Sequence, residues 1–166
     1  MRRRSFVLLA ALAAALAPAA AHAQSSAAGE EAAVRAVIDR MFDGMRQADS
    51  AMVRGVMHES ARLQTTDRGP DGQARLRVEP IENFLRAVGT PRTAVWDERI
   101  SNVRVQVDDN LATAWMDYGF FVDGRFSHCG VNAFQLFRSA DGWKVIQIAD
   151  TRRRQGCPQN AAPAGD

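Results

Sequence analysis

The sequence lacks the short motifs by which many enzymes are recognised. It contains no serine-nucleophile motif, no glycine-rich phosphate loop and no dinucleotide-binding fingerprint. Histidine is scarce, and neither His58 nor His128 begins an H-x-x-H, H-x-H or H-E-x-x-H spacing. We therefore expect no metal site and no cofactor, and we argue function from the fold and from individual side chains.

Beyond the N-terminus, the chain also lacks an apolar run long enough to span a bilayer, which takes about 20 residues. At the N-terminus, three arginines (2–4) precede a short apolar run (6–17) and the cleavage-type sequence Ala21-His22-Ala23. This order predicts a signal peptide over residues 1–23, and hence a periplasmic or secreted protein. Arg3-Arg4 before Ser-Phe-Val also resembles a twin-arginine signal, so the export route stays open.

An excess of positive charge is absent as well. The 21 Lys and Arg stand against 19 Asp and Glu, and three of the arginines belong to the predicted signal peptide. The remaining chain gives no reason to expect a nucleic-acid partner, which calls for a clustered positive face. Its length suits one domain. We predict a small-residue linker over residues 24–29, a domain over 30–157 and a disordered Ala/Pro/Gly tail over 158–166.

The chain has two cysteines, Cys129 and Cys157. Thiols outside the cytoplasm tend to pair, so we expect a disulfide that fastens the segment "TRRRQGCPQN" to the sheet. The chain-entropy model gives such a bridge about 3.5 kcal/mol. The alternative, a reactive thiol, would need a nearby base and would leave the second cysteine unexplained.

Helical periodicity is confined to the first half of the chain. The clearest apolar stripe, at i, i+3, i+4, i+7, i+8 and i+11, consists of Val34, Val37, Ile38, Met41, Phe42 and Met45. Asp49 is typical of the N-cap of a second helix to about residue 57, and Pro80 of the start of a third that ends at Gly89. Strands are expected over 59–66 and 75–78.

From residue 93 onward, alternating apolar and polar residues predict strands, and Asp123-Gly124 and Asp141-Gly142 predict hairpins. Helices followed by a long meander indicate an α+β fold. We expect an antiparallel sheet of about five to six strands, covered by three N-terminal helices.

Three segments in this order carry a resemblance: "QADSAMVRGVMHESARLQTT", "IENFLRAV" and "FQLFRSADGWKVIQIAD". Together they resemble the nuclear transport factor 2-like superfamily over about residues 30–152. The resemblance implies a cone-shaped fold with an internal pocket, shared with ketosteroid isomerase-like and polyketide cyclase-like enzymes. The strand "HCGVNAF" and the ending "DTRR…C" are similar to a secreted branch labelled "putative lumazine-binding", for which no activity is implied.

The implied pocket makes the facing of each strand residue important. If Val122 pairs with Arg125 across the turn and the register continues unbroken, alternate residues share a face. One face then carries Trp115, Asp117, Phe126, His128, Asn132 and Phe134, and the other carries Met116, Tyr118, Cys129, Val131 and Phe137. The expected ligand-binding residues are Trp96, Trp115, Asp117, His128, Asn132 and Phe134. A bulge near Gly119 or Gly130 would reset this assignment.

His128 is the first candidate for chemistry, as a general acid or base with Asp117 or Asp150 as its partner. A hydrogen-bonded structural or pocket-lining histidine is the alternative. The ketosteroid isomerase-like pattern of one Tyr and two Asp does not map cleanly, because Tyr118 and Asp117 fall on opposite faces. Arg152, Arg153 and Arg154 are interpreted as a solvated strand end, or as a grip on an anionic ligand.

Three functions remain in view, in this order. The first is an exported module that binds a small organic ligand without a reaction. The second is an acid–base enzyme (isomerase, dehydratase or cyclase) that uses His128. The third is a structural homodimer through the open sheet face. The fold hosts all three, so the residues of the site have to decide.

Overall fold

The computed structural model describes the backbone of residues 17–157 and the side chains of residues 28–157. Most of the predicted signal peptide (1–16) and the predicted tail (158–166) therefore lie outside the described residues. Of the helices described, none combines the length and hydropathy needed to cross a membrane.

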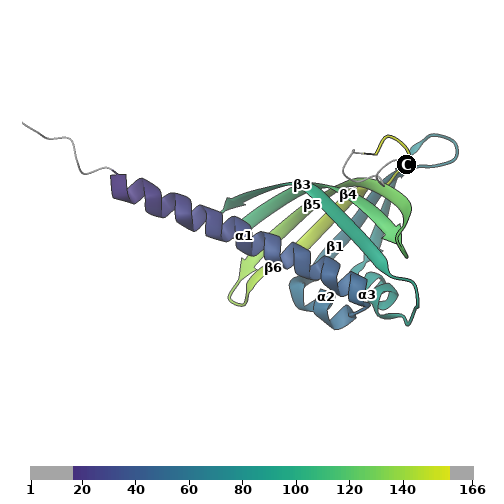
Figure 1. Ribbon diagram of the computed structural model, residues 1–166, viewed down its shortest axis with the longest axis horizontal. Helices are drawn as coiled ribbons and strands as arrows, with labels where there is room; N and C mark the ends of the chain where they lie inside the picture. The colour runs from purple at the N-terminus through teal and green to yellow at the C-terminus, as the bar shows by residue number, and fades with distance from the viewer. Residues whose placement is uncertain (1–16, 158–166) are drawn as a thin grey trace, which may run out of the picture.

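Within residues 17–157, three helices lie on one side of the sheet (Figure 1). Helix α1 spans Ala17–Gln47, and therefore includes residues 24–29, which the sequence analysis assigns to a linker. Helix α2 spans Ser50–Val56, and the carboxylate of Asp49 caps it by accepting a hydrogen bond of 2.8 Å from Met52 N. Helix α3 spans Ile81–Gly89 and follows Pro80, whose fixed φ suits a helix start.

Six strands form a single sheet in the order β2-β1-β6-β5-β4-β3. Their bounds are β1 Met57–Arg68, β2 Ala74–Pro80, β3 Trp96–Asp108, β4 Leu111–Val122, β5 Arg125–Ser139 and β6 Gly142–Thr151. Strands β3 to β6 form the expected meander of antiparallel neighbours, and β1 and β2 form a hairpin of their own.

The α+β class is confirmed, with three helices and six strands, but two details of the prediction are wrong. The sheet is mixed rather than antiparallel, because β1 runs parallel to β6. The free edge of β6 is where the early hairpin can pair once β3 to β5 occupy the other side. In addition, α3 follows β2 in the chain, so the helices do not all precede the sheet.

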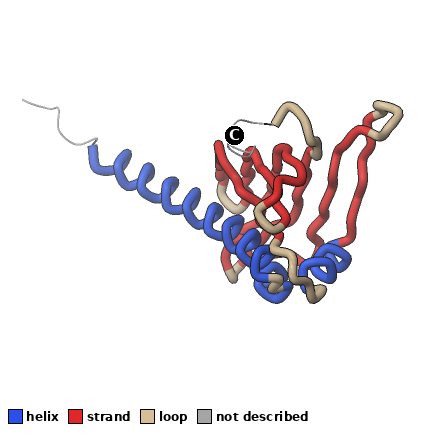
Figure 2. The backbone as a smooth tube through the Cα atoms, turned by 45° about the vertical axis from the view of Figure 1, so that its right-hand side comes forward, coloured by secondary structure: helices blue, strands red, loops and turns tan. Residues whose placement is uncertain are grey.

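The helices cover the inner face of the curved sheet (Figures 1 and 2). The apolar stripe of α1 is buried there as predicted, with Val34 and Ile38 completely inaccessible to solvent and Phe42 at 4% exposure. The ring of Phe42 meets Phe134 of β5 edge to face, with centroids 6.1 Å apart. Burial of this stripe supplies the main contact between helix and sheet.

One irregularity in β5 decides which side chains reach the inner face. Phe121 pairs with Phe126, but the next pair is Phe120 with His128. Ser127 is therefore an extra residue without a partner on β4, which is a β-bulge. Beyond the bulge, every residue of β5 pairs with β4 one position away from the partner it would have in an unbroken register. Side chains of β4 and β5 that an unbroken register places on the same face therefore lie on opposite faces.

Candidate functional site

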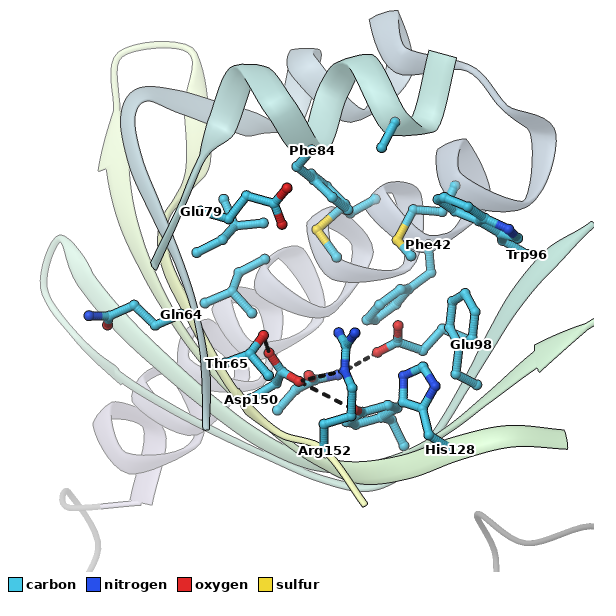
Figure 3. A pocket seen from close by; sticks show the side chains of 18 of the residues that line it. Phe42, Gln64, Thr65, Glu79, Phe84, Trp96, Glu98, His128, Asp150 and Arg152 are labelled. Carbon is cyan, nitrogen blue, oxygen red and sulfur yellow. Dashed lines mark hydrogen bonds and ion pairs between the residues drawn. The ribbon is translucent and has the colours of Figure 1, made fainter. Parts of the chain in front are cut away.

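A cavity of about 410 Å³ lies between the inner face of the sheet and the helices (Figure 3). Its apolar lining comes from both the helices and the sheet: Met41, Phe42 and Met45 of α1, Phe84 and Ala87 of α3, and Leu63, Trp96, Phe120, Val122, Phe134 and Ile148 of the sheet. This volume falls in the range of pockets that bind small organic molecules.

Polar side chains gather on the strand side of the cavity. They are Thr65 of β1, Glu98 of β3, Tyr118 of β4, His128 and Asn132 of β5, Asp150 of β6, and Arg152 just beyond it. Gln64 and Glu79 of the β1–β2 hairpin complete the lining. Strands far apart in the sequence thus bring several titratable groups into one concave site.

Glu98 is hydrogen-bonded to the buried side chain of Asn132. Its Oε1 accepts a hydrogen bond of 2.7 Å from Asn132 Nδ2. Loss of solvation raises the pKa of the Glu98 carboxyl to about 7, and the nearby negative charge of Asp150 acts in the same direction. Near neutral pH this carboxyl can therefore both give and take a proton.

Asp150 has partners on both oxygens. Its Oδ1 accepts from Thr65 Oγ1 at 2.6 Å, and its Oδ2 accepts from Tyr118 OH at 3.3 Å. The single hydrogen of this hydroxyl is shared with the carbonyl oxygen of Thr151 at 2.9 Å, so the contact with Asp150 is the longer branch of a bifurcated hydrogen bond. Burial and the charges of Asp150 and Glu98 raise the pKa of Tyr118, so the phenol stays protonated and acts as a donor.

His128 lies against aromatic rings rather than against a carboxylate. Its ring stacks on Phe120 with centroids 4.9 Å apart, and its Nδ1 is 3.0 Å from Ser127 Oγ. Burial, together with the positive charges of Arg152 and Arg154, lowers the pKa of His128 to about 4. The imidazole is therefore neutral at neutral pH, with one nitrogen able to donate and the other able to accept a hydrogen bond.

The sequence-based prediction of which strand residues face the cavity is partly right. The structure brings Trp96, His128, Asn132, Phe134 and Asp150 to the cavity. As ligand contacts, these residues remain a prediction.

Asp117 and Trp115 are corrections to that prediction, because both lie on the outer face of the sheet. Asp117 accepts a hydrogen bond from Asn102 Nδ2 at 2.8 Å, and Trp115 is 54% exposed. The physical reason is the bulge at Ser127, which pairs Asp117 with Val131 and Trp115 with Ala133. The pairing of His128 with Asp117 is thereby ruled out.

Two groups in the cavity were missed by sequence reasoning. Tyr118, predicted on the face opposite His128, shares the inner face with it once the bulge is taken into account, and the two rings lie 5.8 Å apart. Glu98 was not singled out at all. Its position two residues after Trp96 on one strand was the available signal, since residues i and i+2 of a strand share a face.

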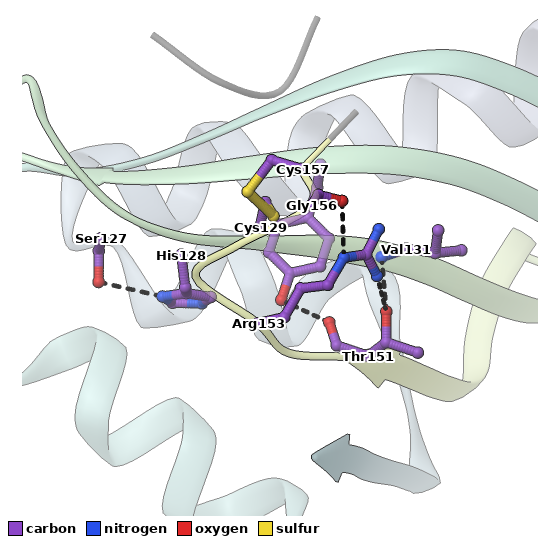
Figure 4. Close-up of a disulfide and its surroundings, with 9 residues drawn as sticks. Ser127, His128, Cys129, Val131, Thr151, Arg153, Gly156 and Cys157 are labelled. Atoms are coloured by element: carbon purple, nitrogen blue, oxygen red, sulfur yellow. Dashed lines mark hydrogen bonds between the residues drawn. A yellow bond between two sulfur atoms is a disulfide. The ribbon is translucent and has the colours of Figure 1, made fainter. Parts of the chain in front are cut away.

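The predicted disulfide between Cys129 and Cys157 is present, with Cα atoms 5.8 Å apart (Figure 4). The segment after β6 returns along β5, where Cys129 and Arg153 exchange backbone hydrogen bonds of 2.8 and 2.9 Å. Gly130 makes this approach feasible, because a Cβ atom there would lie 1.8 Å from the carbonyl oxygen of Thr151. The disulfide thus fastens the segment that carries Arg152 to the strand that carries His128.

Comparisons with known proteins agree with this architecture. A family model described as "Putative lumazine-binding" matches residues 29–148. A comparison with curated proteins finds none that matches the chain.

Solved structures give the fold. A nuclear transport factor 2-like protein of unknown function from Shewanella baltica is 17% identical, with a TM-score of 0.58 over 77% of this chain and 97% of that one. A protein of this type from Novosphingobium aromaticivorans, with a cystatin-like fold, is 14% identical, with a TM-score of 0.59 over 86% and 91%. A protein described as a putative dehydratase from Streptomyces avermitilis is 12% identical, with a TM-score of 0.56 over 75% and 96%.

Such low identities carry the fold and not the activity of these neighbours. The match of the family model covers most of the chain, and the solved structures share its overall fold. The chain has the nuclear transport factor 2-like fold and belongs to the family described as "Putative lumazine-binding".

Proposed function

We propose that this chain is an exported domain that holds a small organic ligand in the cavity beneath α1 and α3. The cone shape implied by the superfamily, the leader over residues 1–23 and the domain limits of 30–157 belong to this proposal. The observation that carries it is the composition of the cavity: an apolar, largely aromatic lining from helices and sheet surrounds a group of hydrogen-bonding side chains on the strands. This division is typical of ligand pockets, where apolar walls supply affinity and a few polar groups fix orientation.

The test is direct binding of two defined probes. Lumazine is chosen because the description of the family names it. The second probe, 2-(2-naphthyl)ethanol, is a flat neutral compound that the description does not name. We expect saturable binding of at least one of them by isothermal titration calorimetry, accompanied by a change in tryptophan fluorescence. Trp96 lines the cavity, so binding should perturb its emission.

Two tryptophans provide a matched pair of variants. Trp96→Ala removes an aromatic surface of the cavity and should weaken binding about tenfold or more. Trp115→Ala removes a tryptophan of the outer face and should leave affinity unchanged. The proposal fails if neither probe binds, or if binding persists in Trp96→Ala and disappears in Trp115→Ala.

A second candidate function, acid–base catalysis, is favoured by Glu98. A carboxyl with a pKa of about 7 beside a protonated phenol suits proton transfer at neutral pH better than a histidine with a pKa of about 4. The sequence predicts His128 with Asp117 or Asp150 for this role, and Asp117 lies on the outer face. In the structure, Asp150 instead pairs with Thr65 and Tyr118.

This candidate has a probe of its own, the ring ketone 2-tetralone in deuterium oxide. As base, the Glu98 carboxylate would take a proton from the carbon next to the carbonyl, exchange it with solvent and return a deuteron. Proton NMR would follow the loss of the signal. An exchange rate equal to that of buffer alone, or one unchanged in Glu98→Gln, would rule out this reaction.

We also propose a homodimer through the outer face of the sheet. Trp115, Leu111 and Phe137 lie there with 54%, 47% and 36% exposure. Leu111 and Phe137 are direct partners across β4 and β5, so the three side chains belong to one face. A cluster of exposed large apolar side chains is a feature of interaction surfaces.

A further inference from the structure

The geometry points to Arg152 as the residue that selects the ligand of this cavity, and to a carboxylate on a flat apolar body as the ligand class. This inference rests on the proposed binding function and deepens it. It follows from asking which polar groups of the cavity already have partners within the protein and which do not.

The acidic groups of the strand side are largely satisfied. Asp150 accepts hydrogen bonds on both oxygens, from Thr65 and Tyr118. Glu98 accepts one from Asn132, and its buried carboxyl favours the neutral form. Neither group therefore presents a full, unpartnered negative charge to a ligand, and a cationic ligand would find little to bind.

Arg152 differs from these groups, because only one edge of its guanidinium is engaged. Its Nε lies 3.7 Å from Asp150 Oδ2, while the group itself points into the cavity (Figure 3). Within the described residues, no hydrogen bond of ordinary geometry ties either terminal nitrogen to another side chain or to the backbone, although the guanidinium lies close enough to Tyr118 to act on its hydroxyl. Two parallel N–H donors on a planar cation match the two oxygens of a carboxylate.

The backbone holds this arginine at the cavity. Arg152 N donates to Thr66 O at 3.0 Å, so the residue is tied to β1. The following residue, Arg153, exchanges backbone hydrogen bonds with Cys129, and Cys157 closes the segment by its disulfide. Because the backbone is already anchored, binding a ligand does not have to order this segment, which lowers the entropic cost of binding.

The neighbouring arginine is oriented differently. Arg153 Nε donates to Gly156 O at 3.1 Å, and Arg153 is not part of the cavity lining (Figure 4). The two residues are adjacent and equally charged, yet only Arg152 reaches the cavity. They therefore form a matched pair for separating a specific contact from a general effect of positive charge.

Glu79 is the opposing charge that has to be weighed. It lies on β2, on another wall of the cavity, and is exposed, so water and salt screen its field. The side chain of Arg152 is itself 45% exposed, but a ligand carboxylate would contact it directly rather than at a distance. The contact therefore outweighs the screened repulsion, and the apolar body of the ligand would lie against Phe42, Phe84 and Trp96.

The experiment compares three probes that share the naphthalene ring and a two-carbon arm: 2-naphthylacetate, 2-(2-naphthyl)ethanol and 2-(2-naphthyl)ethylammonium. Calorimetric titration at pH 7 measures each affinity for the unmodified protein. We expect 2-naphthylacetate to bind about 10- to 100-fold more tightly than the alcohol, as a charge-assisted bidentate contact allows, and the ammonium compound to bind most weakly.

Variants then assign the preference to one side chain. Arg152→Gln should reduce the affinity for 2-naphthylacetate to that for the alcohol while leaving the alcohol unchanged, and Arg152→Lys should retain part of the preference. Arg153→Gln should behave like the unmodified protein. The alcohol serves as a folding control, because its binding reports an intact cavity in every variant.

The outcomes separate the inference from the proposed function. If no probe binds, the proposed binding function fails. If the alcohol binds and the acetate shows no advantage, or if Arg153→Gln abolishes the advantage and Arg152→Gln does not, the carboxylate inference is overturned while the cavity remains a binding site. If the ammonium compound bound most tightly, the inference would also be overturned, because the acidic side chains of the cavity would then determine which ligand binds.

Discussion

Asn132 Nδ2 and Glu98 Oε1 are 2.7 Å apart and join β5 to β3 across the intervening strand β4. Asn132 is 3% exposed, so this hydrogen bond is made where water does not compete. The amide orients the carboxyl toward the cavity, while burial keeps the proton on it at pH values where an exposed glutamate would have lost it. A buried acid of this kind makes stability depend on pH in an unusual direction.

Glu98 should lower stability as pH rises. The pKa of the carboxyl is about 7 in the folded protein against 4.5 as its ordinary value, so between these limits the folded state binds one proton more. The free energy of unfolding then falls with increasing pH, by about 3 kcal/mol for this group alone across the interval. Glu98→Gln, which cannot ionise, should remove that component.

The measurement is urea denaturation at pH 5 and pH 8 for the unmodified protein and for Glu98→Gln. We expect the variant to gain stability relative to the unmodified protein at pH 8 and to gain none at pH 5. Glu59→Gln, a change at an exposed glutamate of β1, is the control. An identical pH profile for the unmodified protein and Glu98→Gln would contradict the raised pKa.

His128→Ala should weaken ligand binding without changing its pH dependence above pH 6. The imidazole has a pKa of about 4, so it is neutral over this range and contributes one donor and one acceptor rather than a charge. Loss of one hydrogen bond to a bound ligand amounts to about 1 kcal/mol, or a few-fold to tenfold in affinity. Calorimetry with lumazine or 2-naphthylacetate at pH 6 and pH 8 measures both quantities.

The matched control is His58→Ala. His58 lies at the start of β1, makes an edge contact with Phe137 and is not part of the cavity lining. It should leave affinity unchanged. If His128→Ala changed affinity at pH 8 and not at pH 6, the histidine would have to titrate in that range, against the lowered pKa.

The helices and strands of this fold can be predicted from the sequence more accurately than the direction in which the strand side chains point. The 3.6-residue period of α1, the cap at Asp49 and the turn at Asp123-Gly124 are local signals, and each was predicted from a few neighbouring residues. The parallel pairing of β1 with β6 is a long-range consequence of which sheet edge remains open, and nothing within either strand encodes it.

The site shows the same division. A single unpaired residue, Ser127, moves Asp117 out of the cavity and Tyr118 into it, because the side-chain period of a strand is two. Alternation of apolar and polar residues cannot locate such a bulge when both faces of β4 carry apolar residues. Glu98 was hidden for a related reason, since a glutamate in a strand is expected to face solvent.

Replacing Phe42 by Ala should cost about 3–5 kcal/mol of unfolding free energy. The ring is 4% exposed and packs edge to face on Phe134, so its loss leaves a cavity between helix and sheet. Urea denaturation followed by circular dichroism measures the change. Arg40→Ala, at an exposed position on the same helix, should cost less than about 0.5 kcal/mol. A loss below about 1 kcal/mol in Phe42→Ala would contradict this packing.

Reduction of the Cys129–Cys157 disulfide should destabilise the protein by about 3.5 kcal/mol in the chain-entropy model, given a sequence separation of 28. Mass spectrometry without reductant should find the protein, if recovered from an oxidising compartment, two hydrogens lighter than its dithiol form. Denaturation with and without dithiothreitol measures the energy, and a variant with both cysteines changed to serine should not respond to the reductant. Two free thiols in exported material would contradict the pairing.

Disruption of the outer face should convert a dimer into a monomer. Trp115 is 54% exposed on this face, where a large apolar side chain would be buried by a second copy of the chain. We expect light scattering after size exclusion to give twice the chain mass for the unmodified protein and the chain mass for Trp115→Arg. Arg104 pairs with Trp115 across β3 and β4, so the new arginine adds like charge on both copies of the face. Leu76→Arg is the control, because Leu76 is 61% exposed but lies on the edge strand β2.

A dimer with a micromolar dissociation constant would be populated at a protein concentration of about 100 μM. If the unmodified protein is still monomeric at that concentration, this face is excluded as a self-association surface.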